Sequence, residues 1–289
     1  YRIPLYATGD SVELVAGYSS VDSGTVQGLF DVSGNGRLFG ARYIHKPARA
    51  GDYAQQISAG FDWRDFTSNV GFNGQPLGNR VLTHPLSVAY GGSWRRNAIE
   101  SGFTATLAHN LPGGRYGREE HFRKARAEAP AAFTVLRVNA HAGVELPRNW
   151  QLRMDFQAQY SADPLVSGEQ FGLGGADSIR GLRERALAGD KGYKLSADLL
   201  TPALPATQDL RLRGLVFYDC GRLGRNAAQP GEPERQGVAS AGLGLRLDYS
   251  SYLRLRLDWA HILKGSGDTS DAVARAGDER IHASLLVNF

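Results

Sequence analysis

Apolar and polar residues alternate with a period of two along most of this chain. The clearest case is the segment 150–160, where Trp150, Met154 and Phe156 share one face and polar residues such as Arg153 and Asp155 share the other. Such alternation predicts β-strands with one apolar and one polar face. It recurs about twelve times, so we expect strands over residues 12–18, 36–45, 57–63, 86–94, 99–107, 136–146, 150–160, 193–200, 210–220, 238–249, 253–259 and 281–289.

Two all-β architectures share this alternation, a soluble sandwich and a membrane-spanning antiparallel β-barrel. The positions of the aromatic residues separate them, because a lipid-facing barrel carries aromatic girdles at both ends of its apolar face. Here strand ends on the apolar face carry Trp63, Trp150, Tyr160, Tyr249 and Trp259. This placement favours the transmembrane β-barrel.

The connections between the expected strands alternate between short and long. Short ones are 6–10, 46–51, 95–96, 147–149, 201–208 and 250–251, and long ones are 20–35, 64–82, 111–131, 161–192, 221–236 and 264–278. Outer-membrane barrels have short periplasmic turns and longer outer loops. The alternation therefore favours the barrel again, and an even number of strands places both chain ends on the periplasmic side. The loop 111–131 carries charges of both signs, which predicts a solvated outer loop.

Composition excludes several other classes of protein. The chain has 289 residues, 42% of them hydrophobic, and a formal net charge of +4. Basic residues are scattered rather than clustered, so nucleic acid is not an expected partner. A single cysteine, Cys220, permits no internal disulfide, and the dispersed histidines predict no metal site. Nucleophile-elbow, zinc-protease and phosphate-loop motifs are missing from the sequence, so we expect neither an enzyme nor a cofactor.

A glycine-rich stretch, 171–192, joins the expected strands 150–160 and 193–200. Loops of this length are functional or disordered, and the residue content here favours function. Its motif residues are Gly174, Gly175, Ser178, Ile179, Arg180, Gly181 and Leu182. A second motif follows on a strand, with Phe217, Asp219 and Gly221 in alternate positions, and Gly221 predicts a bulge at the end of that strand.

Together the two stretches resemble the signature of the outer-membrane barrel-assembly superfamily, and most of all its two-partner secretion transporters (TpsB, the hemolysin secretion-activation family). The loop motif of that superfamily reads Val/Ile-Arg-Gly-Phe/Tyr, and residues 179–182 match it with leucine in place of the aromatic residue. Residues 217–221 match the strand motif Phe-x-Asp-x-Gly. The resemblance implies that loop 161–192 folds into the barrel lumen, that Arg180 meets Asp219, and that the C-terminal Phe289 belongs to the signal read by the barrel-assembly machinery.

The resemblance also bears on domain organisation. It implies that residues 1–289 form one outer-membrane β-barrel domain without the periplasmic POTRA domains of the family. Barrels of this family have sixteen strands, so either about four strands lie upstream, with residues 1–5 the end of the last one, or twelve strands close by themselves. No signal peptide is present, and we expect the chain to be a mature or truncated piece.

The function implied by the resemblance is a protein-conducting pore in the outer membrane of a Gram-negative bacterium. Such a pore secretes an unfolded partner exoprotein (TpsA-like) without ATP, and its other partners are outer-membrane lipid and, during biogenesis, the barrel-assembly machinery. Two alternatives remain open. One is a factor that inserts other barrels into the membrane, and the other is a passive porin or adhesin barrel.

Overall fold

The computed structural model describes residues 1–26, 30–72, 75–76, 79–205, 210–250, 252–267 and 274–288. Strands dominate it, and the few helical residues form one short α-helix, α1 (Glu119–Ala125), and a 3-10 turn at Pro147–Asn149. The strands are β1 (Arg2–Leu5), β2 (Asp10–Val26), β3 (Phe30–His45), β4 (Tyr53–Phe72), β5 (Gln75–Pro76), β6 (Asn79–Thr83), β7 (Pro85–Arg96), β8 (Ile99–Asn110), β9 (Thr134–Leu146), β10 (Trp150–Tyr160), β11 (Phe171–Leu173), β12 (Leu187–Gly189), β13 (Lys191–Leu200), β14 (Leu204–Pro205), β15 (Leu210–Gly224), β16 (Arg235–Tyr249), β17 (Leu253–Lys264) and β18 (Glu279–Val287).

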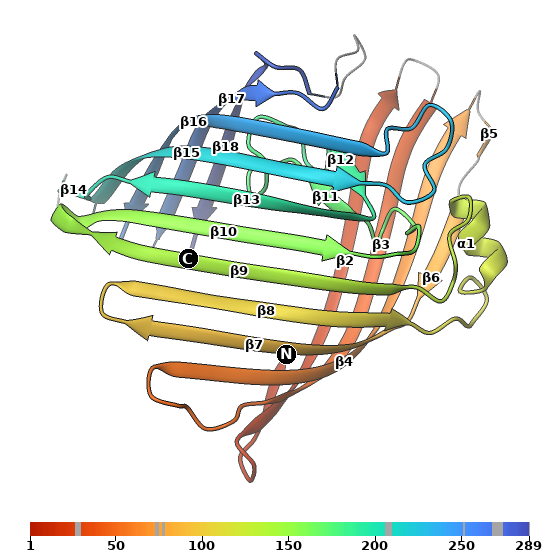
Figure 1. Ribbon diagram of the computed structural model, residues 1–289, viewed down its shortest axis with the longest axis horizontal. Coiled ribbons are helices and arrows are strands. Elements are labelled where there is room, and N and C mark those ends of the chain that lie inside the picture. Colours follow the sequence, from red (N-terminus) through yellow and green to blue (C-terminus); the bar gives the residue numbers. More distant parts are fainter. Residues whose placement is uncertain are drawn as a thin grey trace.

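One curved antiparallel sheet contains all of these strands except β11 and β12 (Figure 1). Its main order is β1-β2-β3-β4-β7-β8-β9-β10-β13-β15-β16-β17-β18, with β5 and β6 paired to β4 and β14 paired to β15. The long strands from β2 onwards match the twelve expected from the alternation, and β10 has the expected bounds. The all-β antiparallel prediction is therefore confirmed, and the sandwich alternative is wrong.

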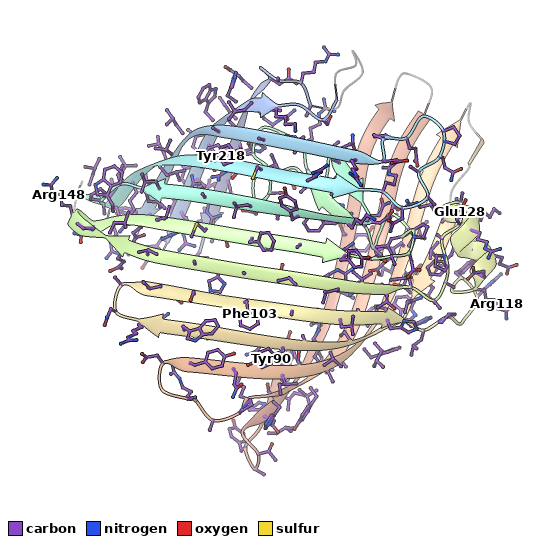
Figure 2. All side chains as sticks on the ribbon, viewed as in Figure 1. Tyr90, Phe103, Arg118, Glu128, Arg148 and Tyr218 are labelled. Atoms are coloured by element: carbon purple, nitrogen blue, oxygen red, sulfur yellow. The ribbon has the colours of Figure 1, made fainter. Side chains whose placement is uncertain are left out.

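The two faces of the sheet differ as the alternation predicts. On β15 the exposed fractions of Val216 and Tyr218 are 49% and 46%. The alternate residues Phe217 and Asp219 are only 3% and 0% exposed. Tyr218 lies on the convex face of the sheet in Figure 2. An apolar convex face around a polar concave face is the arrangement of a membrane-spanning barrel wall. No helix among the residues described is long and apolar enough to cross a bilayer.

The sheet is open, which overturns the alternative of a closed twelve-stranded barrel. Within the described residues, β1 pairs only with β2 and β18 pairs only with β17. Closure would require these two edges to pair with each other.

Two of the expected long loops are strands instead. Residues 20–26 and 30–35 belong to the paired strands β2 and β3, and residues 64–72, 75–76 and 79–82 belong to β4 and its partners β5 and β6. These hairpins extend past the part of the sheet with regular alternation. Period two is weak there because glycines and small polar residues replace apolar ones, so hydrophobic pattern alone could not reveal the pairing.

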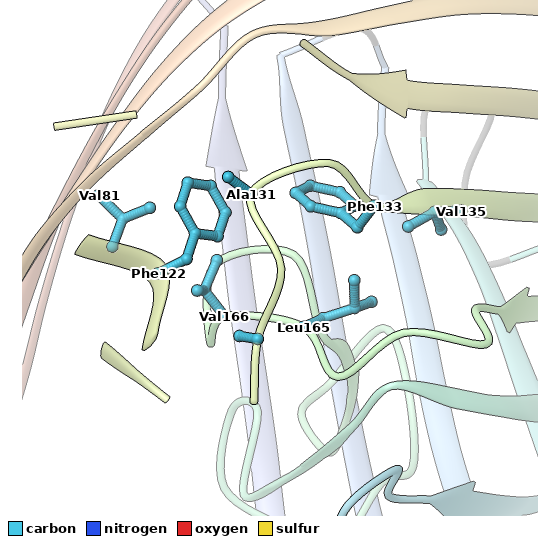
Figure 3. Close-up of a cluster of buried hydrophobic side chains, with 8 residues drawn as sticks. Val81, Phe122, Ala131, Phe133, Val135, Leu165 and Val166 are labelled. Carbon is cyan, nitrogen blue, oxygen red and sulfur yellow. The ribbon is translucent and has the colours of Figure 1, made fainter. Parts of the chain in front are cut away.

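Most charged side chains of the loop 111–131 are exposed, as expected, but the loop also packs as a cap at the outer end of the sheet. Its helix α1 buries Phe122 completely, and an apolar cluster forms around that ring (Figure 3). The buried members of this cluster are Val81, Phe122, Ala129, Ala131, Phe133, Val135, Leu165 and Val166. Leu165 and Val166 belong to the long loop 161–192, so the cap holds the start of that loop in place.

Candidate functional site

The candidate site is the long connection between β10 and β13, residues 161–190, which lies on the concave face of the sheet. Two short strands inside it, β11 and β12, pair with each other and form a separate two-stranded sheet. In Figure 1 they lie behind the front strands, enclosed by the curve of the wall. The connection therefore has a folded structure, and we call it the plug loop.

Arg180, at the tip of the plug loop, makes a bidentate ion pair with Asp219 of β15. Its Nε and Nη2 donate to the two carboxylate oxygens at 2.8 and 2.7 Å, and its backbone N–H donates to the same carboxylate at 3.0 Å. Nη2 also donates to Asp198 at 2.6 Å and to Ser196 at 2.9 Å, both on β13. The Ser196 hydroxyl in turn donates to Asp219 at 2.6 Å. The structure thus brings together the arginine and aspartate of the two motifs.

The surroundings of this ion pair make it costly to break. Arg180 is 4% exposed and Asp219 is fully buried. The guanidinium carbon lies 3.5 Å from the centre of the Phe217 ring, a cation–π contact, which explains the aromatic residue two positions before Asp219. Burial alone would lower the pKa of Arg180, but the hydrogen bonds and charges of Asp219 and Asp198 outweigh it and raise this pKa. Arg180 therefore stays charged across the working range of pH. Removing one partner from a buried pair costs about 3–5 kcal/mol.

Neighbouring motif residues fix the tip against other strands. Ile179 and Leu182 are buried in an apolar cluster with Leu173, Leu187, Leu223, Val238, Ile262 and Ala274. Leu182, which replaces an aromatic residue of the motif, is 3% exposed there. The Gly181 N–H donates to Nε2 of His282 at 3.0 Å, and its carbonyl accepts from Arg280 at 3.2 Å. The tip consequently contacts β13, β15, β17 and β18 at once.

The motif glycines have specific conformational roles. Gly174, Gly175 and Gly181 all have positive φ, and Ser178 Oγ accepts a hydrogen bond from the Gly174 N–H at 3.2 Å. The predicted bulge at Gly221 is wrong, because Gly221 pairs in regular register with Lys194 and Val238. A Cβ on Gly221 would lie 2.9 Å from the Leu173 side chain. Gly221 is required because the plug loop packs directly on the strand at that point.

We expect Gly181→Ala to weaken docking of the tip. Its φ of +100° is strained for any side chain, and the added Cβ would lie 3.1 Å from Ile262. The expected cost is about 1–3 kcal/mol of docking free energy, seen as faster hydrogen exchange at residues 179–182. Gly267→Ala is the control, because nothing lies within 4 Å of its Cβ position. Unchanged exchange in G181A would refute this role.

A second ion-pair cluster, which the sequence did not reveal, holds the first half of the plug loop. Glu169 is 2% exposed and accepts hydrogen bonds from Arg64 of β4 at 2.9 and 3.0 Å. It also accepts from Arg137 of β9 at 2.9 Å and from Thr83 of β6 at 3.0 Å. Arg64 bridges onward to Asp62 at 2.7 Å. Glu169 thus ties the plug loop to strands on the other side of the concave face from Asp219.

A third cluster holds the return of the plug loop at the outer end. Asp190 is fully buried and accepts hydrogen bonds from Nη1 and Nη2 of Arg126, which follows helix α1. Its carboxylate also accepts from the backbone N–H groups of Leu165 and Asn226 at 2.9 and 2.7 Å. This cluster joins the cap, both ends of the plug loop and the connection between β15 and β16.

Three ion-pair clusters attach the plug loop to separate parts of the wall. Among the described residues no group of three or more His, Cys, Asp or Glu could hold a metal ion. Each ion-pair cluster is strong when intact, yet water or other charged groups can replace the polar partners in it. Phe289 lies outside the described residues, so its expected role stays a prediction.

Comparison with known proteins identifies a family whose matched residues include these features. The family model "Haemolysin secretion/activation protein ShlB/FhaC/HecB" matches residues 18–247, which include the plug loop and the strand of Asp219. Among curated proteins no similar sequence is found.

Solved structures share the fold. CdiB from Escherichia coli has a TM-score of 0.75 at 16% identity, with 96% of this chain and 51% of that chain covered. CdiB from Acinetobacter baumannii has a TM-score of 0.70 at 15% identity, with 99% and 48% covered. BamA from Haemophilus ducreyi lacking POTRA domains 1–3 has a TM-score of 0.60 at 13% identity, with 96% and 65% covered. This chain spans about half the length of the two CdiB chains. Because the family model matches well over half of its residues, the chain belongs to the ShlB/FhaC/HecB haemolysin secretion/activation family.

Proposed function

We propose that this chain forms the wall and plug of an outer-membrane pore that secretes a partner protein by two-partner secretion. The single observation that carries the proposal is the buried pairing of Arg180 with Asp219, which holds a folded loop across the concave face of the barrel wall. Membership of the haemolysin secretion/activation family supports a transporter of this class. The wall belongs in the outer membrane of a Gram-negative bacterium, with lipid against its convex face.

The substrate in this proposal is an unfolded exoprotein that passes through the lumen in an extended state. A folded domain would not fit beside a docked plug loop, and an extended chain needs only a narrow path once the loop has moved. No ATP is required at the pore, because folding on the far side makes return unfavourable. Residues 1–289 supply the barrel wall described here and its plug loop, and the barrel-assembly machinery would insert the protein.

Proteoliposomes test this proposal. The complete protein is reconstituted without ATP and given its partner exoprotein, unfolded in urea and then diluted. We expect the exoprotein to become protected from protease in those vesicles whose reconstituted protein is oriented for entry. With vesicles that lack the protein, the exoprotein should remain accessible to the protease. Protection only when ATP is supplied would contradict ATP-independent transport.

The same vesicles address the alternative of barrel insertion. An unfolded outer-membrane barrel precursor replaces the exoprotein, and its folding is followed by electrophoretic mobility. The secretion proposal predicts no acceleration over empty vesicles. Faster insertion of the precursor, without uptake of the exoprotein, would favour an assembly factor instead.

A further inference from the structure

A cavity of about 770 Å³ lies on the concave face next to the plug loop tip. Plug residues 176–178 and Arg180 line one side, and inward-facing residues of β10, β13 and β15 to β18 line the rest. Arginines dominate the wall nearest the short hairpins, and we call them the arginine cluster: Arg153, Arg211, Arg213, Arg246, Arg254 and Arg256. Basic side chains outnumber acidic ones around the cavity.

The strand register places three of these arginines side by side. Arg213 of β15 is opposite Arg246 of β16, and Arg246 is opposite Arg256 of β17. Neighbouring strands are about 4.8 Å apart, and like charges directly opposite each other destabilise a sheet. The row therefore opposes folding of the wall, so a benefit other than sheet stability is needed to explain it.

Carboxylates on the wall neutralise only part of the cluster. Arg246 pairs with Asp258 at 2.8 Å, and Arg254 pairs with Asp248 at 2.9 Å. Among the described residues, the only acidic partner of Arg256 is Asp177 of the plug loop, at 3.6 Å. That carboxylate is 93% exposed, so the attraction is weak. Two positive charges on β15 remain to be explained.

Arg211 lies opposite Asp248 in the strand register, but that carboxylate pairs with Arg254. In the part of the chain that the structure describes, neither Arg211 nor Arg213 has a carboxylate within ion-pair distance. Nη1 of Arg213 is buried and makes no hydrogen bond there. A buried donor without an acceptor is unfavourable by itself. A guanidinium in this condition is suited to an oxyanion, because it can donate two parallel hydrogen bonds to a carboxylate or a phosphate.

We infer that the arginine cluster is a receiving site for acidic side chains of an extended polypeptide, with Arg213 and Arg211 as its main ligands. The two residues lie on the same face of β15, two positions apart, which is about 6.8 Å along the strand. Acidic residues two positions apart in an extended peptide have the same spacing. A lone inorganic anion could satisfy one arginine but would leave the other unoccupied.

The location gives this site its role. The cavity borders Ala176, Asp177, Ser178 and Arg180 of the plug loop, so a peptide held there lies against the docked tip. The choice of a polypeptide as occupant rests on the proposed function. An acidic segment of the exoprotein would accumulate beside the plug loop before the loop moves.

Peptide binding to the complete protein in detergent micelles tests the inference. The probe is fluorescently labelled hexaglutamate, followed by anisotropy, with hexaglutamine as the uncharged comparison and inorganic phosphate as a competitor. We expect hexaglutamate alone to bind, more weakly as salt rises. R211Q/R213Q should lower the affinity for hexaglutamate at least tenfold. R211K/R213K should keep more than half of the affinity, on a logarithmic scale, that R211Q/R213Q loses.

Arg96→Gln is the matched control, because Arg96 is an exposed arginine on the short hairpin between β7 and β8 and lies outside the cavity. Heat-modifiable electrophoretic mobility checks that every variant is folded. Equal affinity of R211Q/R213Q and the unaltered protein, or equal binding of hexaglutamine, would overturn the inference. Binding of phosphate without hexaglutamate would replace it with a small-anion site. Peptide binding needs no secretion, so its failure is distinguishable from failure of the proposed function.

Discussion

Arg180→Ala is expected to release the tip of the plug loop while the barrel wall stays folded. The substitution leaves the buried Asp219 without its cation, and only the Ser196 hydroxyl remains as a side-chain donor to it. A loss of about 3–5 kcal/mol shifts the docking equilibrium by a factor of roughly 10² to 4 × 10³. Hydrogen exchange at residues 179–182 should rise accordingly, and secretion of the partner should fall sharply in cells that contain normal amounts of folded protein.

Arg180→Lys is the matched variant for this prediction. Lysine keeps the charge but cannot make the planar bidentate contact with Asp219 while also reaching Asp198 and Ser196. We expect the R180K protein to lie between R180A and the unaltered protein in both hydrogen exchange and secretion. Normal secretion by a well-expressed R180A protein would refute the role of this arginine.

Glu169→Gln is expected to free the first half of the plug loop from the opposite part of the wall. The amide removes the negative charge shared by Arg64 and Arg137 and keeps one acceptor oxygen, so Arg137 is left with only neutral side-chain acceptors among the described residues, including Gln159. Breaking this buried cluster should cost about 3–5 kcal/mol. Faster exchange at residues 165–173 is the measurement that checks it.

Glu184→Gln is the control within the same loop. Glu184 is exposed and accepts one hydrogen bond, from the Ala176 N–H at 3.0 Å. Its neutralisation should change docking by less than about 1 kcal/mol. If E169Q and E184Q had the same small effect, the second ion-pair cluster would have no part in holding the loop.

Local pattern was sufficient to predict the wall of this protein. Regular alternation located β10 with its observed bounds, because each of its residues faces either lipid-like surroundings or the polar interior. The packing of the loop 111–131 as a cap was missed because Phe122 is one apolar residue among many charges. The alternation of apolar and polar residues also could not predict whether the sheet closes, because closure depends on pairing between strands that are distant in sequence.

The site was predicted only where two motifs lie on the contacting segments. Arg180 and Asp219 could be matched through a resemblance that covers both residues. Glu169 has partners 105 and 32 residues away, at Arg64 and Arg137, and each of those looks like any other polar residue on an alternating strand. A buried carboxylate in a loop gives no local signal, so only the folded wall reveals which arginines meet it.

The most direct test of a pinned plug loop is a double-mutant cycle on Arg180 and Asp219. Hydrogen exchange at residues 179–182 gives the docking free energy of the unaltered protein, R180A, D219A and R180A/D219A. Direct partners should show a coupling energy of about 1–3 kcal/mol, because the second substitution removes a group that the first has already left unpaired. Additive effects, within about 0.5 kcal/mol, would show that this ion pair does not hold the loop in the lumen.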